Sequence, residues 1–448
     1  MSQPLPFNDF HWEESESFSK RDIMSIDPDA ETGYILEVDL LYPEQLHDAH
    51  NDYPLAPERL TVHEEMLSQG HITLRRKYSM KFEETTKLVP NLFDKSHYII
   101  HIKLLQLYMS LGLELQSIHR VLSFHQSAWL RPYISINTDK RSAAKSAFEK
   151  DFYKLMNNAV YGKTCENLRK RVDVRIIKRD RKRLSILQKP NCKGFKIFDE
   201  NLIGVNLAKF KLKINKPTYV GFAVLEISKH LMYTFHYNFI RRKYQDKAKL
   251  LFTDTDSLMY EIEREDLYQD FHDSKDLFDF ASFPKDSQFF DATNNKVIGK
   301  FKDEENGIPI IEFVGPKAKL YSYQKENRDG ARRAKGIQRS IVRQKLSHQS
   351  FHDQLFHPEV SLLENNRIQS DRHHLFTSSL LKKGLNSFDD KRFLLGDGVH
   401  TLAHGNYRSR ALIKESIIAD ENEEAPILEA SNSADDSTEA ELSESDFD

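Results

Sequence analysis

The chain has 448 residues, of which 39% are hydrophobic and 30% charged, with a formal net charge of -3. Its length allows two or three domains or one elaborate domain, and its two cysteines, Cys165 and Cys192, exclude a disulfide framework and a cysteine-rich metal site. No stretch approaches the roughly 20 apolar residues that cross a bilayer and the N-terminus lacks a secretory pattern, so we expect an intracellular protein without a membrane partner. The sequence does not indicate whether the protein is nuclear or cytoplasmic.

In chain order, the patterns predict a strand at residues 34–40 and a helix over 97–124 with a possible break near Gly112. A second helix is predicted over 143–171, and a third begins after Pro217 and ends at a basic cluster. Strands are predicted at 250–252, 258–262, 308–314 and 320–323. This mixture predicts an α+β fold.

The C-terminal residues 415–448 hold 13 Asp and Glu and no Lys or Arg. We expect a disordered acidic tail there, which either stays solvated or competes with nucleic acid for a basic groove. The preceding residues contain 65 basic and 55 acidic side chains, an excess that suits a polyanionic partner without proving one.

The segment LLFTDTDSLMYEIE has two apolar runs around a polar centre, as expected of a β-hairpin with acids at its turn. If the chain is extended there, Asp254 and Asp256 lie on one face, where a divalent cation would relieve their repulsion. Such hard oxygen ligands favour Mg²⁺ or Mn²⁺. The alternative is an exposed turn in which the Asp and Ser side chains only cap backbone groups.

The segment KLMNNAVYGKT places Lys154, Asn158 and Tyr161 at i, i+4 and i+7, on one side of a predicted helix. A lysine there can hold triphosphate oxygens, and the tyrosine with Gly162 can form a flat wall beside a base pair. The alternative is an amphipathic helix with a buried tyrosine and a solvated lysine.

Together, K-x3-N-x2-YG and the later DTDS resemble two signature motifs of family B DNA polymerases, in the same order. The resemblance implies that Asp254 and Asp256 bind Mg²⁺ or Mn²⁺ in catalysis, with Asp256 the more direct ligand. It also implies that dNTP is contacted by Lys154, Asn158, Tyr161 and Gly162. Two departures are Ala159, where relatives often have Ser, and Thr253, where many have Gly or another small residue.

In FVGPKAKLYSYQ, Lys319 and Tyr321 resemble the K-x-Y element that holds the primer strand in this family. Lysine can meet a phosphate and tyrosine can pack on a sugar. An ordinary strand with alternating Lys and Tyr is the alternative. The resemblance spans roughly residues 30–345 and is to the protein-primed kind found in mobile elements and linear plasmids.

The resemblance implies a palm, fingers and thumb architecture with an antiparallel palm sheet and helical fingers. The implied partners are primer-template DNA, dNTP and a terminal priming protein. The implied domains are a partial palm with an inserted region at 1–95, fingers at 96–185, palm with an insertion at 186–300, palm end and thumb-like region at 301–414, and the tail at 415–448.

Two other polar segments are ambiguous. Residues 169–183, RKRVDVRIIKRDRKR, either line a DNA channel or form a solvated basic surface. His47, His50 and Asp52 in LHDAHND suggest a metal site less strongly than a polar loop.

Family B polymerases need a further aspartate on a palm strand before the fingers, because two cations are bridged by carboxylates of both strands. Asp39 in ILEVDLLYP is out of register with that motif, whose position would fall on Glu37. The opening MSQPLPFNDFHW instead resembles the segment that follows the first carboxylate motif. We therefore expect that aspartate and the proofreading exonuclease to lie outside this chain, with substitution by Glu37 or Asp39 as the alternative.

The function that these motifs imply is DNA-directed DNA polymerisation in DNA replication, with this chain inactive alone if the first palm aspartate is missing. A non-catalytic DNA-binding remnant of a decayed mobile element is the first alternative. A two-metal nuclease built on DTDS is the second.

Overall fold

The computed structural model describes residues 1–414, apart from 179, 328 and 372–373, so the predicted acidic tail lies outside the described residues. Helices and strands contribute in similar measure, which confirms the α+β class. Among the described residues, no helix has the length and apolar character that a membrane span requires.

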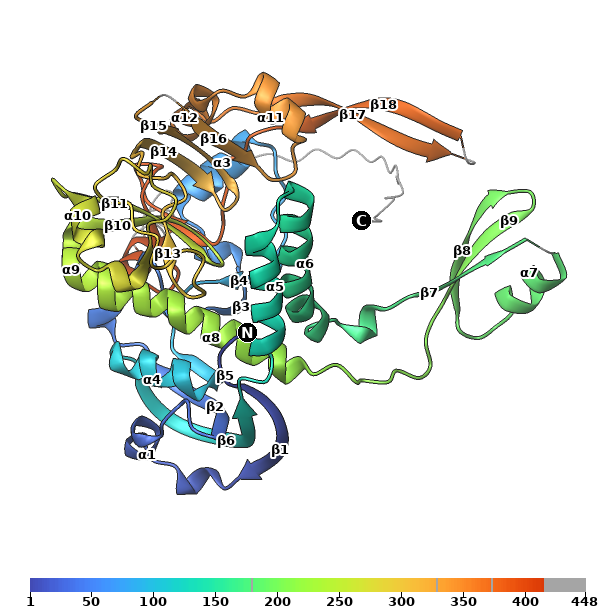
Figure 1. The fold of residues 1–448 in the computed structure, drawn as a ribbon. Coiled ribbons are helices and arrows are strands. Elements are labelled where there is room, and N and C mark those ends of the chain that lie inside the picture. The colour runs from blue at the N-terminus through green and yellow to red at the C-terminus, as the bar shows by residue number, and fades with distance from the viewer. Residues whose placement is uncertain (179, 328, 372–373, 415–448) are drawn as a thin grey trace, which may run out of the picture.

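The N-terminal part is a four-stranded antiparallel sheet in the order β1-β6-β2-β5, at the bottom of Figure 1. Its strands are β1 (Leu5–Glu13), β2 (Thr32–Leu41), β5 (Lys95–His101) and β6 (Glu114–Ser127). Leu36, Val38 and Leu40 alternate along β2 and are buried against helix α4 (Ile102–Ser110), as the period of a half-buried strand requires. Helix α1 (Lys20–Ser25) closes the same core through Ile23.

The predicted helix over residues 97–124 is wrong for most of its length. Only Ile102–Ser110 is helical, and it lies between strands β5 and β6. Gly112 has φ +104°, a conformation that suits glycine and turns the chain back into β6. The apolar residues after Gly112 are buried or partly buried because β6 is a central strand between β1 and β2, so they do not form a helical face.

Two helices form an antiparallel hairpin that stands on a long third helix (Figure 1). The hairpin consists of α5 (Arg131–Ala143) and α6 (Ala147–Thr164), and Ser146 caps α6 in a capping box with Glu149. The long helix is α8 (Thr218–Thr234), which starts after Pro217 as predicted and continues through the π-helix η5 (Phe235–Arg241) into α9 (Arg242–Tyr244). The predicted helix over 143–171 corresponds to α6.

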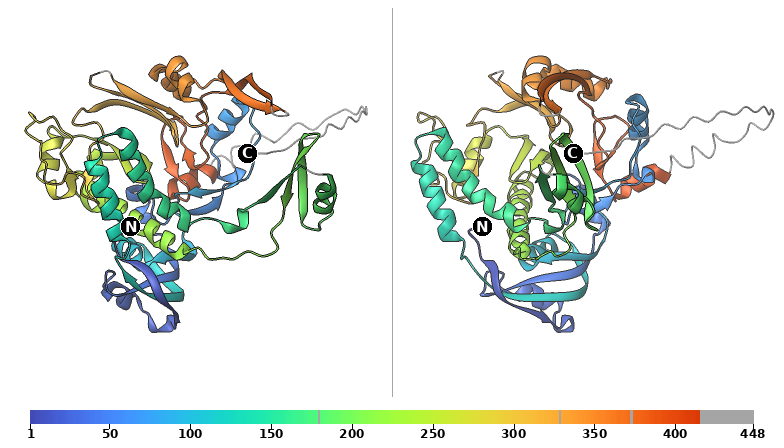
Figure 2. Two further views of the ribbon diagram at one scale, coloured as in Figure 1. Left: turned by 45° about the vertical axis from the view of Figure 1, so that its right-hand side comes forward. Right: turned by 90° about the vertical axis from the view of Figure 1, so that its right-hand side faces the viewer.

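Between α6 and α8 the chain leaves the body and builds a small projecting sheet, at the right of Figure 1 and again apart from the body in the left view of Figure 2. The strand order is β7-β9-β8. The elements are β7 (Asp173–Ile177), α7 (Asp180–Leu187), β8 (Cys192–Asp199) and β9 (Leu202–Leu207). Its core is small and contains Ile177, Ile203, Val205 and Leu207.

After α9 the chain forms the hairpin of β10 (Ala248–Asp254) and β11 (Ser257–Ile262), which packs on the π-helix end of the long helix. A three-stranded antiparallel sheet comes next, in the order β14-β15-β16, with β14 (Ile310–Lys317), β15 (Leu320–Lys325) and β16 (Gly330–Ala334). The strands predicted at 34–40, 250–252, 258–262, 308–314 and 320–323 all correspond to strands of the structure, with ends that differ by a few residues.

The remaining elements are short or peripheral, and a long hairpin of β17 (Leu362–Asp371) and β18 (His374–Lys383) projects at the top of Figure 1. The other helices are α2 (His47–His50), α3 (Gln69–Lys77), α10 (Leu267–His272), α11 (Arg339–Lys345) and α12 (His348–Phe356). The other strands are β3 (Glu58–Thr61), β4 (Thr86–Val89), β12 (Phe278–Asp279), β13 (Phe301–Lys302), β19 (Arg392–Leu394) and β20 (Thr401–Ala403).

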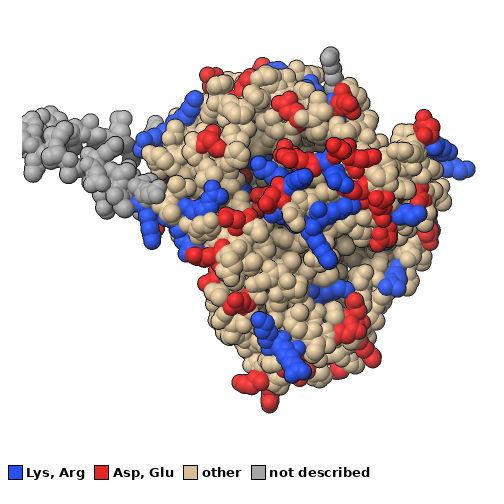
Figure 3. Space-filling view, turned by 90° about the vertical axis from the view of Figure 1, so that its left-hand side faces the viewer, with Lys and Arg blue, Asp and Glu red and all other residues tan. Residues whose placement is uncertain are grey.

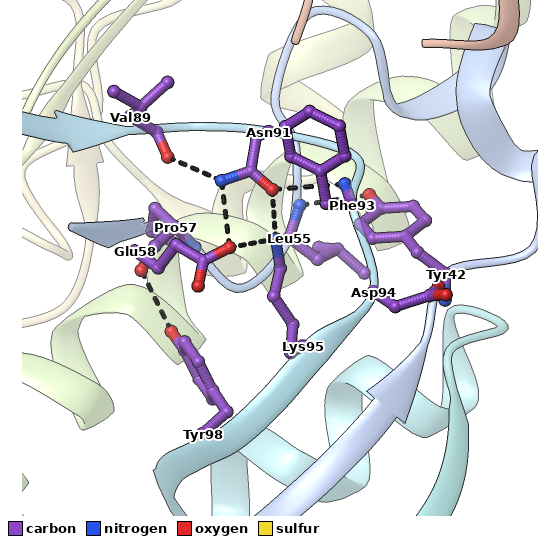
Figure 4. Close-up of polar contacts among 10 residues, drawn as sticks. All are labelled: Tyr42, Leu55, Pro57, Glu58, Val89, Asn91, Phe93, Asp94, Lys95 and Tyr98. Carbon is purple, nitrogen blue, oxygen red and sulfur yellow. Dashed lines mark hydrogen bonds and ion pairs between the residues drawn. The ribbon is translucent and has the colours of Figure 1, made fainter. Parts of the chain in front are cut away.

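A buried polar network ties β5 to the β3–β4 region (Figure 4). The ammonium of Lys95 has no exposed side-chain surface and donates to Glu58 at 2.8 Å and to Asn91. The Asn91 amide also donates to Glu58 at 3.1 Å. Burial lowers the pKa of Lys95, and the charge of Glu58 opposes that shift. A buried lysine is tolerated here because each of its neighbours completes a hydrogen bond.

Candidate functional site

The hairpin β10–β11 has two faces with different partners. On the inner face, Tyr260 meets His236 of the π-helix with Oη and Nδ1 3.0 Å apart, and Leu258 and Ile262 pack in the same core. A register shift between Leu250 and Phe252 marks a β-bulge. Since side chains alternate along a strand, this bulge turns the rest of β10 over, so that Phe252 and Asp254 share the outer face.

The two predicted metal-binding acids occupy different positions in this hairpin. Asp254 is the last residue of β10 and pairs with Ser257, whereas Asp256 lies in the two-residue turn and is exposed. Thr255, between them, has φ +58°, which is unusual for a β-branched residue. The expected extended chain therefore holds for Asp254 and not for Asp256, because the turn ends the alternation of the strand.

The capping interpretation accounts for Ser257 and not for the carboxylate of Asp254. The Ser257 hydroxyl donates to the Asp254 carbonyl at 3.3 Å, as a turn residue does. The carboxylate of Asp254 instead faces a cation from a distant strand, since Nζ of Lys319 lies 3.3 Å from its Oδ1. The structure thus brings together residues from two motifs that are separated by more than sixty positions in the sequence.

The second residue of the K-x-Y element lies at the same place. The ring of Tyr321 packs on that of Phe252, with centroids 4.7 Å apart, and contacts Phe313 and Tyr323 at 6.0 and 6.4 Å. Burial raises the pKa of the Tyr321 phenol, so it remains a neutral hydrogen-bond donor at physiological pH. The outer face of the hairpin and the outer face of β15 therefore form one continuous surface that carries an acid, a lysine and stacked aromatic rings.

The predicted nucleotide-binding residues share a helix, as expected, but have different surroundings. Lys154 and Asn158 of α6 are exposed, and so is Gly162, where an added Cβ would meet nothing. Tyr161 is partly buried and packs with Val160 on a core that includes Val224 of α8. These surroundings fit a helix that binds a nucleotide. They fit equally an amphipathic helix with a packed tyrosine and a solvated lysine.

Among the described residues, no hydrogen bond or ion pair joins Lys154, Asn158 or Tyr161 to the acids of the hairpin. The elements that carry the two groups contact the long helix at different points, α6 near Val224 and the hairpin at His236. Twelve residues of helix separate these two contacts, which corresponds to about 18 Å along its axis. The long helix is thus the rigid element that positions both groups.

A third carboxylate does not join the two acids in the part of the chain that is described. No group of three or more His, Cys, Asp or Glu there is arranged to hold a metal ion. Glu37 and Asp39 lie on β2, in the N-terminal sheet, and already have partners. Glu37 binds Arg120 at 2.5 Å, and the Asp39 carboxylate accepts from Ser117 at 2.6 Å. These partners hold the pKa values of both carboxyls below their usual range.

Two other predicted segments have structural partners. His47 and His50 belong to the short helix α2 rather than to a loop, and both are buried. Nδ1 of His50 lies 2.9 Å from the Tyr42 hydroxyl, so this imidazole has a hydrogen-bond partner. In the basic segment 169–183, Arg171 pairs with Glu166 at 2.6 Å just before strand β7 of the projecting sheet. Whether this basic segment lines a DNA channel stays a prediction.

A hollow near the foot of the hairpin is poorly suited to a triphosphate. Figure 3 views the side of the molecule that carries α10 and β10–β11, and acidic and basic side chains alternate across it. A cavity of about 380 Å³ at the foot of β10 is lined by five acidic and three basic side chains: Asp48, Asp52, Asp246, Glu261, Glu263, Arg241, Lys247 and Lys249. A surplus of negative charge disfavours a polyanion.

The sequence did not reveal two residues of this surface. Phe252 is the platform for Tyr321, and its alternation with Asp254 along the predicted strand was a signal that these two side chains share a face. Arg333 on β16 pairs with Tyr321 across the sheet, and only the strand register places it there.

No protein-family model matches the chain, and no curated protein matches it. Among solved structures, phi29 DNA polymerase complexed with primer-template DNA (post-translocation binary complex) is 13% identical with a TM-score of 0.47, over 85% of this chain and 55% of that chain. The ternary complex of the same polymerase with DNA and incoming nucleotide substrates has the same identity and TM-score, over 86% and 55%. Its orthorhombic crystal form is 14% identical with a TM-score of 0.42. The chain spans little more than half the length of those polymerases, and likenesses with TM-scores this low do not establish a shared function.

Proposed function

We propose that this chain is the polymerising region of a family B DNA polymerase of the protein-primed, mobile-element kind, and that it binds primer-template DNA and dNTP. The observation that carries the proposal is the convergence of two motifs. The DTDS hairpin and the K-x-Y strand resemble elements of one active site, and here Asp254 lies 3.3 Å from Lys319 while Phe252 packs on Tyr321.

In this proposal the two acids of the hairpin hold a divalent cation, Mg²⁺ or Mn²⁺. Their donor set fits one such ion, because Mg²⁺ keeps several waters and is commonly held by one or two carboxylates together with substrate phosphates. Bound there, the cation would stabilise the charge that develops on the phosphate oxygens. Asp254, with 40% of its side chain exposed, is open to an ion once Lys319 moves aside.

The reaction would be attack by a primer 3'-hydroxyl, or by a hydroxyl of a terminal protein at initiation, on the α-phosphorus of a dNTP. The new phosphodiester bond forms as the bond to pyrophosphate breaks. Lys319 would hold a primer phosphate and Tyr321 would pack on its sugar. Lys154 and Asn158 would contact the triphosphate, and Tyr161 with Gly162 would lie against the new base pair.

We expect the chain alone to bind DNA better than it extends it. Two-metal transfer needs carboxylates from two strands, and the described residues bring only Asp254 and Asp256 to this place. This shortage also favours the second candidate, a non-catalytic DNA-binding remnant. Fusing an aspartate-bearing palm strand to the N-terminus of the chain distinguishes the two. The polymerase then gains primer extension, and the remnant does not.

The test is incubation of the purified chain with a labelled primer-template, all four dNTPs and Mg²⁺, with product length read on a gel. We expect binding of the DNA, unchanged primer length, and extension only by the chain with the added palm strand. The matched variant Asp254→Asn, Asp256→Asn should bind DNA and never extend it. Robust extension by the chain alone would refute the missing carboxylate, shortened primer would indicate a nuclease, and absence of DNA binding would refute the proposal.

A further inference from the structure

One strand of the three-stranded sheet carries an arginine on the same face as the K-x-Y tyrosine. In the antiparallel ladder of β15 and β16, Tyr321 lies opposite Arg333, and Tyr323 lies opposite Ala331. Residues directly opposite one another project from the same face, so Arg333 lies on the face of the sheet that carries the ring of Tyr321. Its charge acts on both phenols and works against the burial that raises the pKa values of Tyr321 and Tyr323.

The other cations of this face already have acidic partners. Lys319 pairs with Asp254 at 3.3 Å. Lys325 pairs with Glu305 at 3.0 Å, and the Tyr323 hydroxyl donates to the same carboxylate at 2.5 Å. Within the described chain, Arg333 is exposed and forms no ion pair, and its one hydrogen bond runs to the carbonyl of its neighbour Arg332. Among the described residues, the face that carries the stacked rings of Tyr321 and Tyr323 therefore also carries Arg333, a cation without an acidic partner.

We propose that Arg333 binds a phosphate of the DNA strand that lies across the outer face of β14, β15 and β16. This inference rests on the proposed function and adds a residue that the sequence motifs do not contain. A guanidinium can hold a phosphate with two parallel hydrogen bonds, and the neighbouring Tyr321 ring offers a surface for the adjoining sugar. Arg333 is a positioning residue here, because it acts on the strand backbone away from the reacting atoms.

The chain offers a matched control at the next residue. Arg332 has the same charge and is also exposed, but it lies opposite the buried Ser322 and so belongs to the other face of the sheet. The experiment compares the full chain with R333A, R332A and R333K by fluorescence anisotropy of a labelled primer-template over a series of salt concentrations. Binding of dATP is measured in parallel by equilibrium dialysis, and unfolding temperatures confirm that the variants fold.

We expect R333A to bind the primer-template about tenfold more weakly, since a hydrogen bond to a charged group is lost. The slope of log affinity against log salt should fall by about 0.9, the value for one phosphate contact. R332A should match the wild type in both respects, R333K should retain the slope, and dATP binding should not change.

Three results would overturn the inference, and they are distinguishable. A wild-type chain that does not bind DNA removes the proposed function and this inference together. A wild-type chain that binds DNA, with R333A and R332A alike, removes this inference alone. Loss of dATP binding in R333A with normal DNA affinity would assign the guanidinium to the free triphosphate rather than to the strand.

Discussion

The ion pair between Lys319 and Asp254 leads to a prediction about metal binding. If the hairpin acids hold a divalent cation, the ammonium of Lys319 competes for the same carboxylate in the absence of DNA. Replacing it in Lys319→Met keeps much of the apolar stem and removes the competing charge. The chain should then bind Mn²⁺ more tightly.

The size of this effect depends on the exposure of the pair. The side chains of Lys319 and Asp254 are 55% and 40% exposed, and exposed pairs contribute about 0.2–1 kcal/mol. Removing such a competitor should tighten Mn²⁺ binding by a factor of about 1.4 to 5, because 1.4 kcal/mol corresponds to tenfold. Higher salt should shrink the difference, because it screens the pair in the wild type.

The assay is a Mn²⁺ titration followed by electron paramagnetic resonance, in which free Mn²⁺ gives the signal. Lys285→Met is the control, because Lys285 is an exposed lysine outside the hairpin and the K-x-Y strand. Asp254→Asn should weaken binding in both the wild type and Lys319→Met. If Lys319→Met binds Mn²⁺ no better than Lys285→Met, Lys319 does not compete for a cation site at Asp254.

Three further predictions concern the fold and the aromatic surface. Lys95→Met removes the cation shared by Asn91 and the partly exposed Glu58 and should lower the free energy of unfolding by about 1–3 kcal/mol, and the added Glu58→Met should recover part of that loss in a urea titration. Burial lowers the pKa values of His50 and His101 to about 4, whereas the unfolded chain has the ordinary value near 6.5. Lowering the pH from 7 to 5 should therefore reduce the free energy of unfolding by roughly 2 kcal/mol for each of these imidazoles, because the unfolded chain takes up the protons. The unfolding temperature should fall steadily over that interval, and a flat profile would show that these imidazoles are not buried as neutral groups. Phe252→Ala removes the platform under Tyr321 and should weaken DNA binding, whereas Phe252→Tyr should keep it, as measured by anisotropy; equal weakening by both would refute the stacking role.

Local patterns predicted the hairpin and the long helix well. The acids between two apolar runs indicated β10 and β11, and Pro217 with the apolar stretch after it indicated α8, because in both cases the determining residues are neighbours in the sequence. Residues 97–124 were predicted as helix because their apolar content alone does not show which distant strands they pair with. The central position of β6, between β1 and β2, depends on pairing with distant strands.

In the candidate site, too, features set by neighbouring residues were predicted, and features set by pairing between strands were not. The sequence named Asp254, Lys319 and Tyr321, and the structure places them together. It did not predict that a β-bulge after Leu250 turns Asp254 away from the inner core, because a bulge is a property of the pairing and not of either strand. Arg333 was missed for the same reason, since its position opposite Tyr321 is set by strand register. The relation of Lys154 to the hairpin depends on the length of the helix between them, which no motif encodes.

The most direct test of a cation site at the hairpin is localised cleavage of the chain by bound iron. Fe²⁺ in place of Mg²⁺, with ascorbate and peroxide, generates radicals that cut the backbone near the ion, and mass spectrometry maps the cuts. We predict cuts at the turn of β10–β11 and in β15 beside Lys319, lost in Asp254→Asn, Asp256→Asn and suppressed by excess Mg²⁺. Cuts confined to other regions, or unchanged in that variant, would contradict the account.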